Sequence, residues 1–186
     1  MSRQKRTPKL AAQEILRKSG SPRLANGIAI DVQRIIEEHC GFEIHEIDGL
    51  DPGGYPVLGL FVPNYNIVMI EADCIEPRKR FSMAHELGHA ELEYDFGDAD
   101  SLFDLGEPKM FGCTSEDEDL HNMDERHAGY RRLKEILANK FAANLLMPEG
   151  LVRQIWREWR DAERVANALA VSREAIGYRL HELGLN

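Results

Sequence analysis

The sequence lacks most features that mark secreted, membrane-spanning or disulfide-bonded proteins. Its 186 residues include only 3 cysteines, an odd number without a Cys-x-x-Cys pair, so we expect no disulfide framework. No apolar run is long enough to span a membrane, and the polar, basic opening at 1–8 has no apolar core of a signal peptide. These absences predict a cytoplasmic protein without membrane contact.

A strong charge of one sign is also missing from most of the chain. The net charge is −9, but it belongs mainly to residues 91–126, where many acids are opposed only by Lys109 and Arg126. The remainder is nearly neutral, so composition does not exclude contact with nucleic acid. With 43% apolar and 30% charged residues, we expect a disordered basic tail at 1–9 and one globular domain at 10–186.

Local patterns predict an α+β fold that is mainly helical. Apolar spacing and helix-ending residues predict helices at 10–18, 31–39, 77–94, 130–146, 150–168 and 173–183. Alternating residues and a turn at 51–54 predict strands at 42–47, 57–62 and 65–70. The last two strands should form a hairpin, so the expected sheet is small and antiparallel.

The most informative stretch is Arg80-Phe81-Ser82-Met83-Ala84-His85-Glu86-Leu87-Gly88-His89. His85 and His89 are four residues apart, so on a helix both imidazoles could bind one metal ion. Glu86 lies about 100° round such a helix from His85, where it could accept a proton from a metal-bound water. Gly88 costs a helix about 1 kcal/mol relative to alanine, which would make sense if another backbone passes close by. The alternative is a surface helix with two solvated histidines.

A catalytic zinc site needs a third protein ligand and one open position. The candidates near the motif or downstream of it are Asp95, His121, His127 and Glu135. Glu135 is the attractive choice because it lies on the strongly predicted helix at 130–146. Asn139 follows one turn later on the same face and could orient a metal-binding histidine through a hydrogen bond.

Two long motifs in this order carry a family resemblance. The segment at 80–89, followed by Glu135-Ile136-Leu137-Ala138-Asn139-Lys140-Phe141-Ala142-Ala143-Asn144-Leu145-Leu146-Met147-Pro148, resembles the ImmA/IrrE family of zinc metallopeptidases. The resemblance covers about residues 10–186 and implies a mainly helical, zincin-like metallopeptidase domain. It implies Zn²⁺ held by His85, His89 and Glu135, with Glu86 as the general base.

The same resemblance implies a substrate. Family members of this kind cut a partner helix-turn-helix repressor and so derepress stress, mobile-element or anti-phage defence genes, often after DNA damage. The chain departs from many members at one place. It has Glu91, Glu93 and Tyr94 where a histidine often follows the second metal-binding histidine.

Cys113 has two interpretations. A free cysteine is usually a small buried apolar side chain. Cys113 also lies between glycine-flanked turns on the segment that joins the two ligand-bearing helices. Its thiolate could therefore occupy the open zinc position and act as an inhibitory ligand.

Two features of the C-terminal region could bind nucleic acid. Four arginines with 4-3-4 spacing lie close to Trp156 and Trp159: Arg153, Arg157, Arg160 and Arg164. They could bind single-stranded DNA as an activator, with bases stacked on the tryptophans, although interleaved acids favour a solvated face. The helices within 150–186 also resemble a helix-turn-helix appendage. The alternative function is therefore a DNA-binding regulatory protein with a structural metal site and no protease activity.

Overall fold

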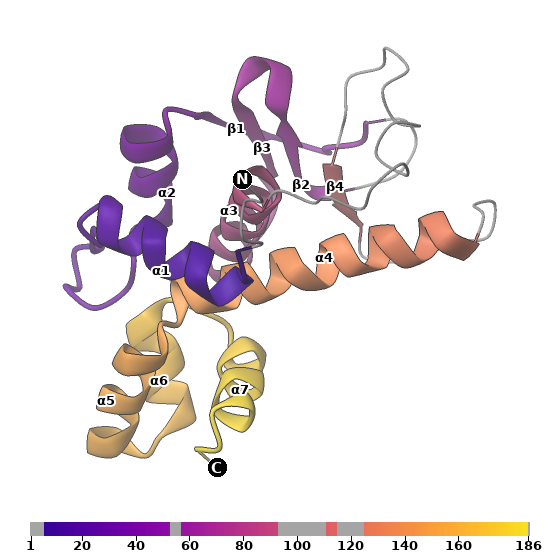
Figure 1. Ribbon diagram of the computed structural model, residues 1–186. Coiled ribbons are helices and arrows are strands. Elements are labelled where there is room, and N and C mark those ends of the chain that lie inside the picture. Colours follow the sequence, from indigo (N-terminus) through magenta and orange to yellow (C-terminus); the bar gives the residue numbers. More distant parts are fainter. Residues whose placement is uncertain (1–5, 53–56, 93–110, 115–124, 186) are drawn as a thin grey trace.

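The computed structural model describes residues 6–52, 57–92, 111–114 and 125–185; at 111–114, 125–128, 130 and 131 it describes the backbone alone. A small sheet lies to one side of the long helix α4 (Glu125–Leu146), and the C-terminal helices lie to the other side (Figure 1). Helix α3 (Glu76–Glu91) contacts both the sheet and α4. Within the described ranges, no helix is long and apolar enough to cross a membrane.

The first helices follow the predicted pattern with one local change. Helix α1 (Pro8–Lys18) begins where the Thr7 hydroxyl accepts a hydrogen bond from the Leu10 N–H. Helix α2 (Val32–Arg34) is capped by Asp31 and continues into the π-helical segment η1 (Ile35–Cys40). Gly41 ends this segment with a φ of 72°, a conformation that glycine adopts without strain.

The sheet has four strands in the order β1-β3-β2-β4. They are β1 (Glu43–Ile47), β3 (Ile67–Glu71), β2 (Val57–Val62) and β4 (Phe111–Thr114). Strands β2 and β3 form the predicted antiparallel hairpin, which turns through the 3-10 segment η2 (Pro63–Tyr65). The prediction of a wholly antiparallel sheet is wrong, because β1 pairs with β3 in parallel. Strand β3 lies between β1 and β2 in the sheet. The alternation of apolar and polar residues along a strand does not indicate which strand will pair with it or in which direction.

The single helix predicted at 150–168 is also wrong, because the chain forms two helices there. Helix α5 (Glu149–Trp159) ends at Arg160, whose φ of 50° is left-handed, and α6 (Ala162–Leu169) starts directly afterwards. The Asp161 carboxylate caps α6 by accepting hydrogen bonds from two backbone N–H groups. This cap stabilises a new helix start inside a continuous apolar pattern. Helix α7 (Arg173–Glu182) follows with Ser172 as its cap.

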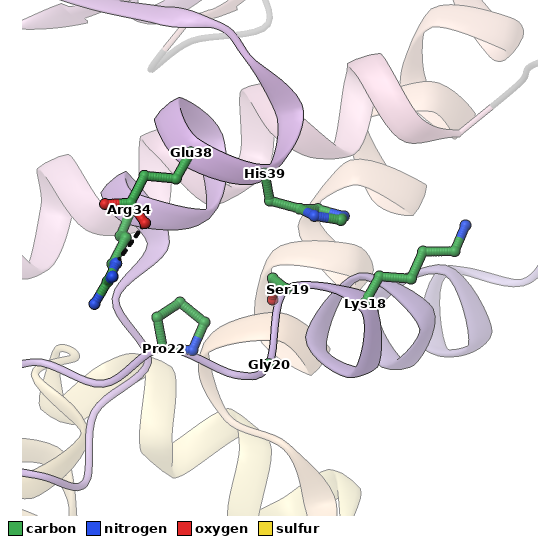
Figure 2. Close-up of a pocket in the computed structure, with 7 residues that line it drawn as sticks. All are labelled: Lys18, Ser19, Gly20, Pro22, Arg34, Glu38 and His39. Atoms are coloured by element: carbon green, nitrogen blue, oxygen red, sulfur yellow. Dashed lines mark hydrogen bonds and ion pairs between the residues drawn. The ribbon is translucent and has the colours of Figure 1, made fainter.

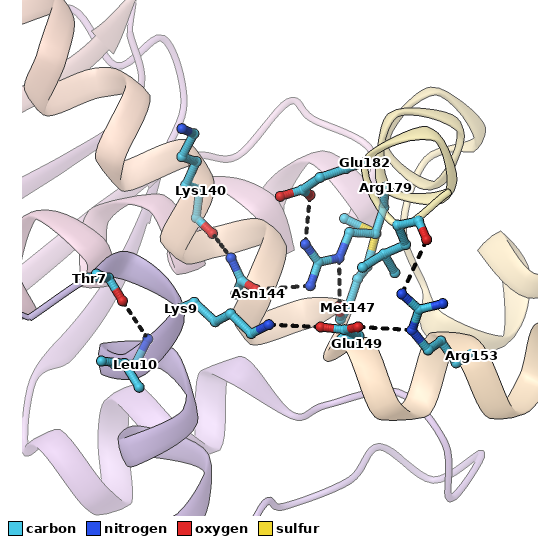
Figure 3. A network of polar contacts seen from close by, with 11 residues as sticks. Thr7, Lys9, Leu10, Lys140, Asn144, Met147, Glu149, Arg153, Arg179 and Glu182 are labelled. Carbon is cyan, nitrogen blue, oxygen red and sulfur yellow. Dashed lines mark hydrogen bonds and ion pairs between the residues drawn. The ribbon is translucent and has the colours of Figure 1, made fainter. Parts of the chain in front are cut away.

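Two buried arginines connect the C-terminal helices to the rest of the protein. Arg80 on α3 donates to the Ile30 carbonyl at 2.6 Å and to the Ala170 carbonyl at 3.0 Å. Arg179 on α7 donates to the Met147 carbonyl at 3.0 Å and to Asn144 Oδ1 at 2.9 Å (Figure 3). The turn between α6 and α7 is therefore bonded to the helix that carries the histidines, and α7 is bonded to the end of α4.

Candidate metal centre

Helix α3 carries the histidine pair into the core. His85 is 1% exposed, Glu86 is 0% exposed and His89 is 6% exposed. The alternative of a surface helix with two solvated histidines is therefore wrong. The pattern of buried residues fits a helix enclosed between the sheet and α4 rather than one at the protein surface.

Three side chains from α3 and α4 converge at one point. The Nε2 atoms of His85 and His89 are 3.0 Å apart, and Glu135 Oε2 lies 3.1 Å from the first while Oε1 lies 3.3 Å from the second. A tetrahedral ion with bonds of 2.0–2.1 Å places its ligand atoms about 3.3 Å apart. The donor set and its spacing therefore fit one divalent metal ion. Within the described residues, His85, His89 and Glu135 form a group of side chains that could hold such an ion.

Asn139 fixes the tautomer of the His85 imidazole at the cluster. Its Oδ1 lies 2.9 Å from His85 Nδ1. Because an amide oxygen can only accept, Nδ1 carries the hydrogen and Nε2 keeps a lone pair directed at the cluster. Asn139 thus occupies the position that the sequence predicted for it, one turn beyond Glu135 on the same helix.

The charges of the cluster also suit a cation. Burial raises the pKa of Glu135, but hydrogen bonds with His85 and His89 outweigh that effect and lower it to about 2. Burial lowers the pKa of His89, and Glu135 acts in the opposite direction. An ionised carboxylate beside a neutral imidazole is the protonation state that metal binding requires.

Gly88 allows the two ligand-bearing helices to approach closely. A Cβ atom at this position would lie 3.2 Å from the Ala138 Cα, 3.2 Å from Phe141 Cδ1 and 3.3 Å from the Ala138 carbonyl oxygen. The prediction that another backbone passes close to Gly88 is confirmed. Ala138 lies between Glu135 and Asn139, so this contact sets the distance between the histidines and both of their partners on α4.

Glu86 is enclosed, and within the described structure neither carboxylate oxygen has a partner in full hydrogen-bond geometry, although the Phe61 backbone N–H lies close enough to act on its charge. Burial raises its pKa well above the usual range, the negative charge of Glu135 adds to that effect, and the Phe61 backbone N–H opposes it. A buried carboxyl group with a raised pKa next to a metal site is suited to accepting and returning a proton. Its side chain lies against Gly59 of β2, a residue that the sequence analysis did not single out. The missed signal was a glycine inside a predicted strand.

Other predicted site residues lie partly outside the described structure. The backbone of Cys113 belongs to β4, next to β2, but its side chain is outside the described part of the chain. Of the alternative ligands, Asp95 and His121 lie wholly outside the described residues, and the side chain of His127 does so too. Inhibition by Cys113 therefore stays a prediction.

The four arginines do not share one helix face, because α5 ends before Arg160. Arg153 donates to Glu149 at 2.8 Å and to the Leu183 carbonyl at 3.2 Å. The Arg164 guanidinium lies 4.3 Å from the centre of the Trp159 ring, close enough for a cation–π contact. This contact covers a ring that a DNA base would need for stacking, and it favours the solvated, packed face.

Two surface hollows lie away from the metal cluster. One, of about 320 Å³, lies between the end of α1 and η1 and is lined by Lys18, His39 and the ion pair of Arg34 with Glu38 (Figure 2). The other, of about 500 Å³, contains the paired charges of Lys9, Glu149 and Arg153 (Figure 3). Neither hollow includes a residue of the predicted catalytic site.

Comparison with known proteins agrees with this site. The buried His-Glu-x-x-His helix and the carboxylate from a second helix define the class as metallopeptidases of the zincin type. The family described as "IrrE N-terminal-like domain" matches residues 111–181, which include Glu135 and Asn139. The radiation response metalloprotease IrrE of Deinococcus radiodurans is 31% identical over 128 residues, which are 67% of this chain and 33% of that protein. These two matches support an ImmA/IrrE family metallopeptidase.

A solved structure shares the fold. A structure described as a Mycobacterium tuberculosis transcriptional regulator has a TM-score of 0.62, covers 93% of this chain and is 17% identical. The present chain spans 46% of that protein and about a third of the length of IrrE. At this level of identity the structural match concerns the fold alone.

Proposed function

We propose that this protein is a zinc-dependent endopeptidase that cleaves a helix-turn-helix transcriptional repressor, which derepresses stress, mobile-element or defence genes. The observation that carries the enzymatic part is Glu86, a fully buried carboxyl group beside a three-ligand cluster, for which the described residues offer no partner in full hydrogen-bond geometry. A structural zinc site has four protein ligands and no need for such a group. Burying it costs free energy, and that cost is expected at functional sites.

The donor set of two imidazoles and one carboxylate is typical of catalytic zinc. A zinc ion held there would act as a Lewis acid and lower the pKa of water to about 7. Glu86 removes a proton from the attacking water and later delivers it to the nitrogen of the leaving amine. Asn139 keeps His85 in the tautomer that leaves Nε2 available, and Glu135 supplies the negative charge.

Support for the repressor as substrate comes from the family resemblance. The relative's name describes a radiation response metalloprotease, and this chain aligns with a third of it. From the name of this relative we extend the proposal to a role after DNA damage. The substrate class and its genetic context belong to the proposal.

The experiment compares wild-type protein with Glu86→Gln and His85→Ala on a helix-turn-helix repressor encoded beside the gene. Wild-type protein with zinc should cut the repressor, and Glu86→Gln should retain zinc but lose at least 100-fold in cleavage rate. His85→Ala should lose both zinc and cleavage. Equal cleavage by Glu86→Gln and wild type would contradict the proposed mechanism.

A second function is suggested by the C-terminal helices. Helix α6, a turn with Ala170 at a φ of 52° and helix α7 follow one another in the order of a helix-turn-helix unit, which supports this second function. A DNA-binding regulator with a structural metal site would bind duplex DNA equally well with Glu86→Gln. A gel-shift assay against promoter fragments of the same locus distinguishes this function from cleavage.

A further inference from the structure

Gly59 occupies an unusual place for a glycine. It lies in the interior of β2, is buried, and pairs with Ile70 of β3. Glycine inside a strand weakens it, because the residue loses more conformational freedom than others and has no side chain to pack. A buried strand glycine therefore needs a local reason.

The backbone conformation does not supply that reason. Gly59 is not among the glycines with a positive φ, so an L-amino acid could adopt its backbone angles. The reason lies in the space above its Cα. A Cβ atom at this position would lie 2.9 Å from Glu86 Oε1, 3.1 Å from Cγ and 3.4 Å from Cδ. The first distance is shorter than real Cβ contacts, so the Glu86 side chain occupies the volume that a larger residue would fill.

Neither the backbone of α3 nor that of β2 can easily move aside. Glu86 is 0% exposed and lies next to His85, which is bonded to Asn139 and Glu135, so rotating α3 would disturb the metal cluster. On the other side, β2 pairs with β3 in regular register from Gly59 to Val62, which holds the Gly59 backbone in place. The pairing of β2 with β4 shifts between Val57 and Leu60, directly around this glycine. Such irregularities often lie next to active sites, where they redirect the chain.

We propose that Gly59 is a positioning residue, whose missing side chain creates the space in which the Glu86 carboxylate is held beside the metal cluster. This inference rests on the proposed role of Glu86 as the base. An added methyl group would push the carboxylate away from its place and leave the three ligands intact. The expected consequence is a protein that binds metal normally and turns over slowly.

The test uses Gly59→Ala in the zinc-loaded 186-residue chain, with Gly177→Ala as the control. A Cβ at Gly177 would meet nothing within 4 Å. Cleavage of a peptide library prepared from the source cell's proteome is measured as new amino termini by mass spectrometry. We expect Gly59→Ala to lose about 100-fold or more in kcat, as for loss of a general base, with KM and zinc content unchanged. The control should cleave at the wild-type rate.

A second measurement tests the steric contact independently of enzymatic activity. The urea midpoint of unfolding is compared for Gly59→Ala in the wild-type, Glu86→Gln and Glu86→Ala backgrounds. The midpoint should fall in the first two backgrounds, where a side chain of full length is present, and should not fall when Glu86 is truncated. The visible spectrum of the Co²⁺-substituted protein should also differ between Gly59→Ala and the Gly177→Ala control.

These measurements separate the two proposals. If wild-type protein cuts nothing in the library, the proposed function fails. The urea midpoints of unfolding still show whether the Glu86 side chain occupies the space at Gly59. If Gly59→Ala lowers the midpoint equally in all three backgrounds, the glycine serves the strand and the inference is overturned. Wild-type kcat in Gly59→Ala would overturn it as well.

Discussion

Replacing Gly88 with alanine adds one methyl group where α3 crosses α4. Two of the three nearest atoms, at 3.2 and 3.3 Å, belong to the Ala138 backbone. A flexible side chain could turn away from the new methyl group, but the backbone of α4 would have to move with Glu135 and Asn139. The variant therefore tests whether close packing of the helices sets the geometry of the metal site.

Two effects of opposite sign determine the stability of this variant. Alanine is favoured over glycine inside a helix by about 1 kcal/mol. Inserting a methyl group into a packed interior costs about 1–3 kcal/mol. Gly177→Ala on α7 gains the helix preference of alanine without the cost of packing an extra methyl group, because nothing lies within 4 Å of its Cβ position. We expect Gly88→Ala to be less stable than Gly177→Ala by about 1–3 kcal/mol.

The assay measures thermal unfolding and zinc affinity for both variants side by side. For a chain of this size, each kcal/mol corresponds to about 2–4 °C in Tm. Zinc affinity, measured by competition with a chromophoric chelator, should fall in Gly88→Ala and stay constant in Gly177→Ala. If Gly88→Ala is as stable as Gly177→Ala and binds zinc like wild type, the reasoning about close packing is refuted.

Three further predictions concern polar groups. Asn139→Ala should weaken zinc binding by about 10–100-fold, whereas Asn139→Asp keeps an acceptor for His85 and should bind more tightly than the alanine variant in the same chelator competition. Arg80→Met leaves two carbonyl oxygens without their donor and should lower the free energy of unfolding by about 1–3 kcal/mol in urea titrations; an unchanged midpoint would contradict this. Hydrogen bonds from Lys9 and Arg153 lower the pKa of Glu149 to about 2, below its ordinary value of 4.5. Its stabilising contribution is therefore complete above pH 4.5 and is lost as the pH falls toward 2, so the difference in Tm between wild type and Glu149→Gln should shrink over this range. A difference that is constant with pH would argue against this pair of contacts.

The pattern of residues along the chain predicted the side chains that the structure brings together in the candidate site. The spacing of His85 and His89, and that of Glu135 and Asn139, are both set by the period of one helix, so each half could be recognised locally. The structure brings the two halves together at distances that fit one ion. Gly88 also gave a usable signal, since a helix-weakening residue within the motif predicted a close backbone contact.

Contacts between distant segments decided the rest. Strand β1 pairs in parallel with β3 because the chain returns between β1 and β2, and its local alternation is the same for either direction of pairing. The break at Arg160 depends on a cap that competes with a continuous apolar pattern. The sequence alone determined that His85 and His89 could bind one metal ion, and it left several candidates for the third ligand. Only the tertiary structure decided that Glu86 would be enclosed against Gly59, because the volume available to a side chain depends on elements far away in sequence.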